Sequence, residues 1–151
     1  RVLINIEIKS DIEQNTPVSG VIEEKVLDLL KREDAFSAVL ISSFDPRIIE
    51  NIKGTNNLLA VAFISETTEG EKTVNFCRGL NVFSFHPNFL SVDKTVVEGM
   101  HEAGVHVFPY NVNSKLEFQR LIDTGADGLI TDEPLLFKKW HARLTTHQSA
   151  H

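Results

Sequence analysis

The sequence has few of the residues and patterns on which several protein classes depend. Cys77 is the one cysteine among 151 residues, so an intrachain disulfide and a cysteine-rich metal centre are excluded. We expect it to pack as a small buried hydrophobic residue. No apolar run of about 18 residues is present, so no transmembrane helix is predicted, and no secretory signal is recognised. The glycines form neither G-x-G-x-x-G nor G-x-x-x-x-G-K-[ST], which removes the usual support for a dinucleotide site or a P-loop.

Positive charge is also scarce. The sequence has 15 lysines and arginines against 21 acidic residues, a formal net charge of −6. Because nucleic-acid binding depends on basic patches, no nucleic-acid partner is expected. An anionic small molecule stays possible, since a bound divalent cation can reverse the local charge. The hydrophobic fraction of 42% suits one globular domain, here residues 1–151. The chain begins at Arg1, one residue before a predicted strand, which we interpret as a processed, truncated or partial N-terminus.

The sequence predicts strands and helices that alternate along the chain. Strands are predicted at residues 2–9, 38–43, 58–64, 81–85, 105–110 and 128–132. Helices are predicted at residues 16–32, 45–54, 72–78, 91–104, 114–125 and 134–140, with a frayed polar tail after Arg143. Thr16, Asp45, Ser91 and Ser114 stand at predicted N-caps. Alternating units of this kind predict an α/β fold with a parallel sheet, either an open doubly wound sheet or part of a (β/α)₈ TIM-type barrel.

The first predicted strand is unusual because one of its two faces becomes charged. Val2, Ile4, Ile6 and Ile8 share one face, and Leu3, Asn5, Glu7 and Lys9 share the other. In parallel α/β proteins, ligands gather at the carboxyl ends of the strands. Glu7 and Lys9 point the same way at that end, which suits a cation and an anion bound side by side. The alternative is a half-exposed edge strand with a solvated Glu7–Lys9 salt bridge.

Polar or aromatic residues follow nearly every other predicted strand. They are Ser43-Phe44, His86-Pro87, Tyr110-Asn111 and Asp132-Glu133-Pro134. An open sheet concentrates its site at one switch point, whereas a barrel draws on the ends of many strands. The distribution of these residues therefore favours the barrel.

Several of these stretches resemble motifs of the glycerophosphodiester phosphodiesterases, metal-dependent hydrolases built on a TIM barrel. Residues 5–9 resemble the family's N-I-E-I-K strand, and residues 41–45 its I-S-S-F-D segment. Residues 85–87 resemble the end of its sixth strand. Residues 104–113 resemble G-x-x-V-x-x-W-T-V-N, with Tyr110 in place of the tryptophan, and residues 125–134 resemble G-V-D-G-I-I-T-D-x-P. The match implies strands three to eight of an eight-stranded barrel.

The resemblance implies roles for five residues. Glu7 matches a carboxylate that binds a divalent cation, Mg²⁺ or Ca²⁺, and Lys9 matches a catalytic lysine that offsets phosphate charge. Phe44 and Tyr110 would form the glycerol side of the pocket, and His86 would hydrogen-bond to substrate near the mouth. The alternatives are a Glu7–Lys9 salt bridge, packing inside the barrel for the two aromatic residues, and a structural histidine.

The family's H-R-G strand and its E-x-D and H-D segments are not in this sequence. In the family these segments supply the acid–base histidines and two metal carboxylates. The resemblance thus implies hydrolysis of a small-molecule glycerophosphodiester to glycerol 3-phosphate and an alcohol, with the acid–base histidines outside these residues. A non-enzymatic binding or regulatory domain of the same family and an open α/β nucleotide-binding module are the alternatives. Open barrel edges are expected to favour self-association.

Overall fold

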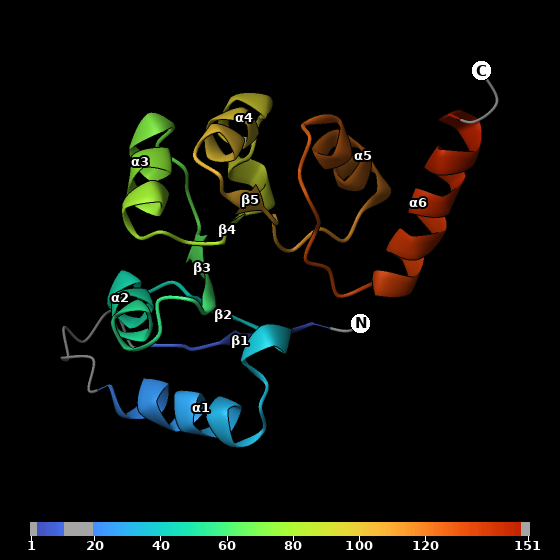
Figure 1. Cartoon of the computed structure of the whole chain (residues 1–151). Helices are drawn as coiled ribbons and strands as arrows, with labels where there is room; N and C mark the ends of the chain where they lie inside the picture. The colour runs from blue at the N-terminus through green and yellow to red at the C-terminus, as the bar shows by residue number, and fades with distance from the viewer. Residues whose placement is uncertain (1–2, 11–19, 149–151) are drawn as a thin grey trace.

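The computed structural model of the protein describes residues 3–10 and 20–148, with side chains up to residue 142 (Figure 1). The strands are β1 (Ile4–Glu7), β2 (Val39–Ser43), β3 (Ala60–Ser65), β4 (Ser84–Pro87) and β5 (His106–Val107). The helices are α1 (Val21–Arg32), α2 (Pro46–Thr55), α3 (Glu71–Gly79), α4 (Lys94–Glu102), α5 (Lys115–Asp123) and α6 (Pro134–Gln148). Two short 3₁₀ helices, η2 (Phe36–Ala38) and η3 (Phe89–Ser91), complete the assignment.

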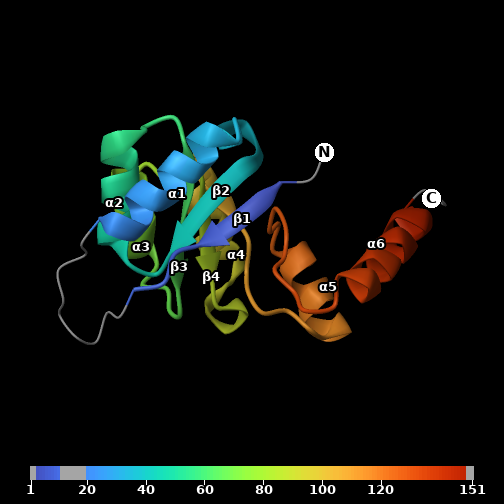
Figure 2. The same cartoon turned by 90° about the horizontal axis from the view of Figure 1, so that it is seen from below.

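The strands lie in the sheet in the order in which they occur in the chain. The order is β1-β2-β3-β4-β5, and each neighbouring pair is parallel. Right-handed crossovers between successive neighbours place all connecting helices on one face. Figure 1 shows α1 to α6 following an arc around the strands, and Figure 2 shows β1 and β2 running side by side in the same direction. The order has no reversal and hence no switch-point crevice, so the open doubly wound nucleotide-binding arrangement is wrong and a partial barrel is supported.

The helix-covered face of the sheet forms the hydrophobic core. Ile6, Ile41 and Val61 pair across β1, β2 and β3, and all three belong to the core or pack against it. Further along, Phe85 and Val107 pair between β4 and β5 and are fully buried. Because side chains alternate along a strand, the residues between these positions must point to the opposite, inner face.

The inner face carries small and polar residues at the same level. Glu7 pairs with Ser42, Ser42 with Ala62, and Ala62 with Ser84. Ser42, Ala62 and Ser84 are each 0% exposed. Their small side chains suit the crowded interior of a barrel better than large apolar ones. The register therefore places Glu7 on the inner face, as the alternation of the first predicted strand indicates.

The prediction of a sixth strand at residues 128–132 is wrong, because this segment is not a strand in the structure. It runs beside the chain that follows β5 through three backbone hydrogen bonds of 2.9–3.1 Å, from Asp127 N to Val107 O, Ile130 N to Pro109 O and Val112 N to Ile130 O. Pro109 has no N–H to donate, so a regular ladder cannot form there.

The predictions at helix ends also need comment. Ser91 does not cap α4: it ends η3, and the Asp93 side chain accepts from Val96 N at 2.9 Å instead. Helix α6 continues to Gln148, well beyond the expected end near residue 140. The caps at Asp45 and Ser114 are confirmed, whereas Thr16 lies outside the described residues. Within the described ranges, no helix is long and apolar enough to cross a membrane.

A first prediction concerns the core. Ile52 of α2 is 0% exposed, whereas Leu58, six residues later, is 90% exposed. We expect Ile52→Ala to lower the free energy of unfolding by about 2–5 kcal/mol, because it removes buried methyl groups and leaves a cavity. Leu58→Ala should change it by less than about 0.5 kcal/mol. Urea unfolding followed by circular dichroism measures both, and equal effects would contradict this description of the core.

A second prediction concerns the edge of the sheet. In the part of the chain that the structure describes, β1 pairs only with β2, and Ile4 is 55% exposed at this edge. Unpaired edges with apolar side chains promote association. We expect the isolated 151-residue chain to sediment with a coefficient that rises with concentration, and Ile4→Lys to reduce that rise. Leu58→Lys, on an exposed turn, is the control. A monomer at every concentration would contradict the prediction.

Candidate functional site

The carboxyl ends of the parallel strands bring the predicted site residues to one end of the sheet. Glu7 ends β1, Phe44 follows β2 directly, and His86 is the last residue but one of strand β4. Tyr110 lies beyond β5 and forms an isolated parallel bridge with Asn88. This bridge continues the register of β4 and β5, so His86 and Tyr110 belong to the inner face together with Glu7.

Glu7 and Lys9 form a long and exposed ion pair. Lys9 Nζ lies 3.9 Å from Glu7 Oε1, and the two side chains are 82% and 36% exposed, respectively. An exposed pair at this distance contributes little to stability. The Glu7 carboxylate has no other hydrogen bond or ion pair among the described residues. The salt bridge that the sequence suggested as an alternative thus exists, but it leaves both charged groups open to a ligand.

Phe44 and Tyr110 lie against each other at the mouth. Their rings meet edge to face, with centroids 6.1 Å apart and planes at 82°. The Tyr110 hydroxyl is buried and meets no partner with hydrogen-bond geometry among the described residues. Burial raises the pKa of this hydroxyl, and the nearby carboxylates of Glu66 and Glu7 raise it further. A neutral phenol therefore lies close to two carboxylates, and Glu7 and the aromatic pair share one site.

His86 lies deeper than the other predicted residues. It is 2% exposed, its Nε2 lies 2.9 Å from Ser84 Oγ, and its ring packs edge to face on Phe108. Burial lowers the pKa of His86 to about 4, so the imidazole is neutral near pH 7. The structure gives it no hydrogen bond or ring contact with Glu7, Lys9 or the Phe44–Tyr110 pair. Its contacts are those of a structural histidine, except that Nδ1 has no hydrogen-bond partner among the described residues.

Three buried side-chain atoms have no hydrogen-bond partner in the part of the chain that the structure describes. They are Ser42 Oγ, His86 Nδ1 and Tyr110 Oη. The register and the alternation of side chains place all three on the inner face. Buried polar atoms are nearly always paired, with protein or with ordered water. Their clustering on one face therefore indicates that this face accommodates a polar ligand or water.

Ser42, Ser84 and Glu66 were not among the site residues predicted from the sequence. Ser42 becomes noticeable only once the register places it beside Glu7, and Ser84 once its hydroxyl is found at His86 Nε2. Glu66 follows β3 and accepts a hydrogen bond from Asn88 Nδ2 at 3.0 Å. A search for polar residues at alternate positions near every strand end could have found all three.

Two other features bear on the chemistry. Within the described residues, no group of three His, Cys, Asp or Glu side chains is placed to hold a metal ion, so Glu7 offers one ligand and not a complete centre. Cys77 is fully buried, and burial raises the pKa of its thiol to about 12. It therefore packs as a hydrophobic residue, as predicted, and does not serve as a nucleophile.

Known proteins resemble this chain in fold and in sequence. A glycerophosphodiester phosphodiesterase of Caldanaerobacter subterraneus is 33% identical over 132 residues, which are 87% of this chain and 52% of that protein. A structure of a Silicibacter pomeroyi homologue of the glycerophosphoryl diester phosphodiesterases matches with a TM-score of 0.84 at 22% identity, covering 95% of this chain and 51% of that one. An Oleispira antarctica phosphodiesterase, solved with its product sn-glycerol-3-phosphate, matches with a TM-score of 0.71 at 18% identity, covering 93% and 55%.

These matches agree on the fold and on its extent. The solved structures have the TIM-barrel fold, so the parallel sheet described above is part of such a barrel. The chain spans about half the length of the relatives that it matches. The sequence model of the glycerophosphoryl diester phosphodiesterase family matches residues 1–136, nearly the whole chain. The chain therefore belongs to the glycerophosphoryl diester phosphodiesterase family.

Proposed function

We propose that this chain supplies the third to eighth strand positions of a phosphodiesterase barrel, the last of them occupied by residues 128–132, which lie beside the segment after β5 without forming a regular strand. In this proposal the barrel hydrolyses glycerophosphodiesters to glycerol 3-phosphate and an alcohol, a reaction of phospholipid and glycerol metabolism. Membership of the family supports the reaction class. The observation that carries the proposal is the inner face, where Glu7 lies beside buried polar atoms that lack partners among the described residues. The product bound by the Oleispira antarctica relative is of the chemical class proposed here.

In this proposal the charged pair at the end of β1 meets the phosphodiester. The Lys9 ammonium is 82% exposed and its partner is 3.9 Å away, so it can approach a phosphate oxygen with little loss of existing contacts. An ammonium placed there offsets the negative charge that develops on phosphoryl transfer to water. Glu7, two residues earlier on the same face, would face the same group through a cation.

The neutral groups would bind the glycerol moiety. The edge-to-face pair of Phe44 and Tyr110 offers an apolar wall, and the Tyr110 hydroxyl offers a donor. His86 Nδ1 has no hydrogen-bond partner among the described residues, so the neutral imidazole can donate to or accept from a hydroxyl there. Neutral donors and acceptors suit a hydroxylated substrate better than a phosphate, which would favour charged groups.

A divalent cation, Mg²⁺ or Ca²⁺, is part of the proposal because such ions prefer carboxylate oxygens. When bound, it would polarise the phosphoryl group. Glu7 is the one candidate ligand among the described residues, which do not themselves form a metal site. The remaining ligands would come from carboxylates outside these residues, such as those of the family's E-x-D segment.

The test of activity compares two polypeptides. We expect no measurable hydrolysis of glycerophosphocholine by residues 1–151 alone, since each acid–base group contributes about 10²–10⁴-fold to a rate. A longer polypeptide that also supplies the H-R-G, E-x-D and H-D segments should be active. In it, Glu7→Gln should lower kcat/KM by about 100-fold or more. Release of glycerol 3-phosphate is the measurement.

Glu98→Gln is the matched control for this test. Glu98 forms a similarly exposed pair with Lys94, at 3.7 Å on α4, away from the inner face. It should leave the rate unchanged. Turnover by residues 1–151 that is indifferent to Glu7→Gln would show that the site lies elsewhere. An inactive longer polypeptide that still binds glycerol 3-phosphate would favour the alternative, a binding or regulatory domain of the same family.

The cation is tested separately by calorimetry. One carboxylate is too few ligands for tight binding of a hard cation, which takes six or more oxygen ligands. We expect the 151-residue chain to bind Mg²⁺ or Ca²⁺ weakly at best, and the longer polypeptide to bind more tightly in a manner that Glu7→Gln reverses. A tight stoichiometric site in the shorter chain would contradict the assignment of the ligands.

A further inference from the structure

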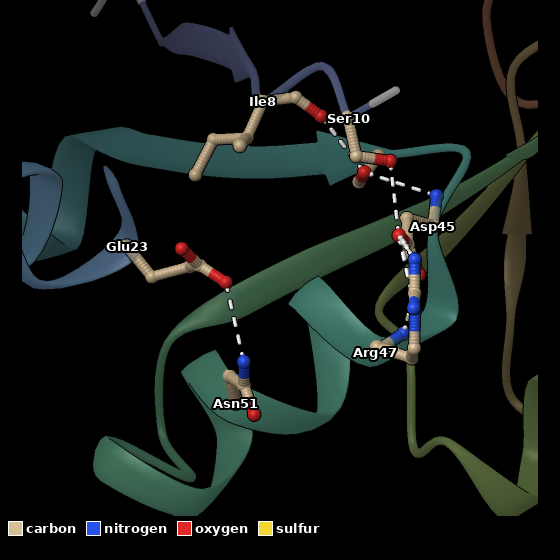
Figure 3. Close-up of polar contacts among 7 residues, drawn as sticks. Ile8, Ser10, Glu23, Asp45, Arg47 and Asn51 are labelled. Carbon is tan, nitrogen blue, oxygen red and sulfur yellow. Dashed lines mark hydrogen bonds and ion pairs between the residues drawn. The ribbon is translucent and has the colours of Figure 1, made fainter. Parts of the chain in front are cut away.

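The segment that carries Lys9 is tied to the turn between β2 and α2 on both sides of the lysine. Ser43 Oγ donates to Ile8 O at 2.8 Å, and Ser10 Oγ donates to Asp45 Oδ2 at 2.9 Å (Figure 3). A third bond, from Ile8 N to the backbone carbonyl of residue 42 at 2.9 Å, extends the pairing of β1 with β2. Lys9 therefore lies between two anchored neighbours, although its own side chain is exposed.

The turn that holds these ties is itself closely bonded. Ser43 is 1% exposed, and its hydroxyl also accepts from Asp45 N at 3.1 Å. Asp45 is 2% exposed and accepts from Arg47 N at 3.0 Å, from Arg47 Nε at 2.9 Å and from Arg47 Nη2 at 2.6 Å. The hydrogen bonds from Arg47 hold the pKa of the Asp45 carboxyl below its usual range, against the opposing effect of burial. The carboxylate thus stays charged and stays in place.

Capping of α2 does not by itself require so many partners. Asp93 caps α4 through one hydrogen bond, from Val96 N. Asp45 makes the equivalent bond to Arg47 N and uses its remaining lone pairs on the Arg47 guanidinium and on Ser10. A buried carboxylate is costly unless it is fully paired, so each of these partners fixes its position. The additional bond that reaches another element is the one to Ser10, next to Lys9.

We propose that Ser43 and Asp45 are positioning residues that hold the end of β1 so that Glu7 and Lys9 present a fixed spacing to the phosphodiester. This inference rests on the proposed function, in which Lys9 meets phosphate. The 3.9 Å pair between the two charged groups is too weak to hold that spacing alone. The ties to Ser43 and Asp45 extend the pairing of β1 with β2 beyond the end of the strand, on both sides of Lys9.

The first experiment uses a matched pair of buried serines. Ser43→Ala removes a hydroxyl with two bonds, whereas Ser42→Ala removes one that has no partner within the described ranges. By NMR on the 151-residue chain, we expect Ser43→Ala to speed hydrogen exchange of the Ile8 amide by about tenfold and to abolish the nuclear Overhauser contact between Glu7 and Lys9. Ser42→Ala should do neither.

Ser10→Ala removes only the hydrogen bond to Asp45 and leaves the core intact. It therefore tests the positioning of Lys9 if Ser43→Ala fails to fold. It too should abolish the contact between Glu7 and Lys9. If either variant folds and retains that contact with wild-type exchange at Ile8, the inference is wrong.

The second experiment tests the link to the ligand with inorganic phosphate, detected at Lys9 by NMR. Asp93→Ala removes a helix cap alone and is the control for that loss, whereas Asp45→Ala removes a cap together with the bonds to Arg47 and Ser10. Only Asp45→Ala should weaken the phosphate effect at Lys9, by about tenfold. If Asp45→Ala and Asp93→Ala bind phosphate equally well, Asp45 has only a structural role and the inference is wrong. Failure of the wild-type chain to bind phosphate would overturn the proposed role of Lys9, while the exchange and contact measurements would still decide the positioning.

Discussion

The candidate site depends above all on the register between β1 and β2, in which Glu7 pairs with Ser42. A slip of one residue would turn Glu7 and Lys9 towards the helices and bring Ile6 and Ile8 to the inner face. The register is specified because Ile8 is 3% exposed and Ile41 is 1% exposed on the helix side, so a slip would expose apolar surface and bury charge. Packing on one face of the strand thereby determines the chemistry on the other.

The inner face separates its charged groups from its neutral ones. Glu7 and Lys9 stand at the exposed rim, in contact with solvent. His86 and Ser84 are buried, and the imidazole of His86 is neutral, because a buried imidazolium without a counter-charge would be strongly unfavourable. Tyr110 lies further towards the carboxyl ends, opposite Asn88, with its ring on Phe44 and its hydroxyl near two carboxylates. A ligand with an anionic end and a hydroxylated end would match this gradient.

Most of the fold was predictable because the signals are local. Asp45 before Pro46 and Ser114 before an amphipathic stretch mark helix starts through short-range hydrogen bonds, and both act as caps. The prediction of a sixth strand was wrong because Pro109, on the neighbouring segment, interrupts the hydrogen-bond ladder. The sequence of residues 128–132 carries no sign of this interruption. Glu7 and Lys9 were found from alternation and resemblance. Ser42 and Glu66 were missed because their relevance comes from neighbours that are distant along the chain.

The sequential strand order also determines how stability is distributed along the chain. Its strongest contacts join each βα unit to the unit before and the unit after it, as in β2 with β3 or α3 with α4. Helix α6 stands at one end of this series and packs on α5, far from α1 in both views (Figures 1 and 2). Such an arrangement has the nearest-neighbour cooperativity of a repeat protein, in which terminal units open before central ones. Within the described sheet β1 pairs with β2 alone, so local opening of the segment with Glu7 and Lys9 breaks fewer contacts than opening of the core around β3.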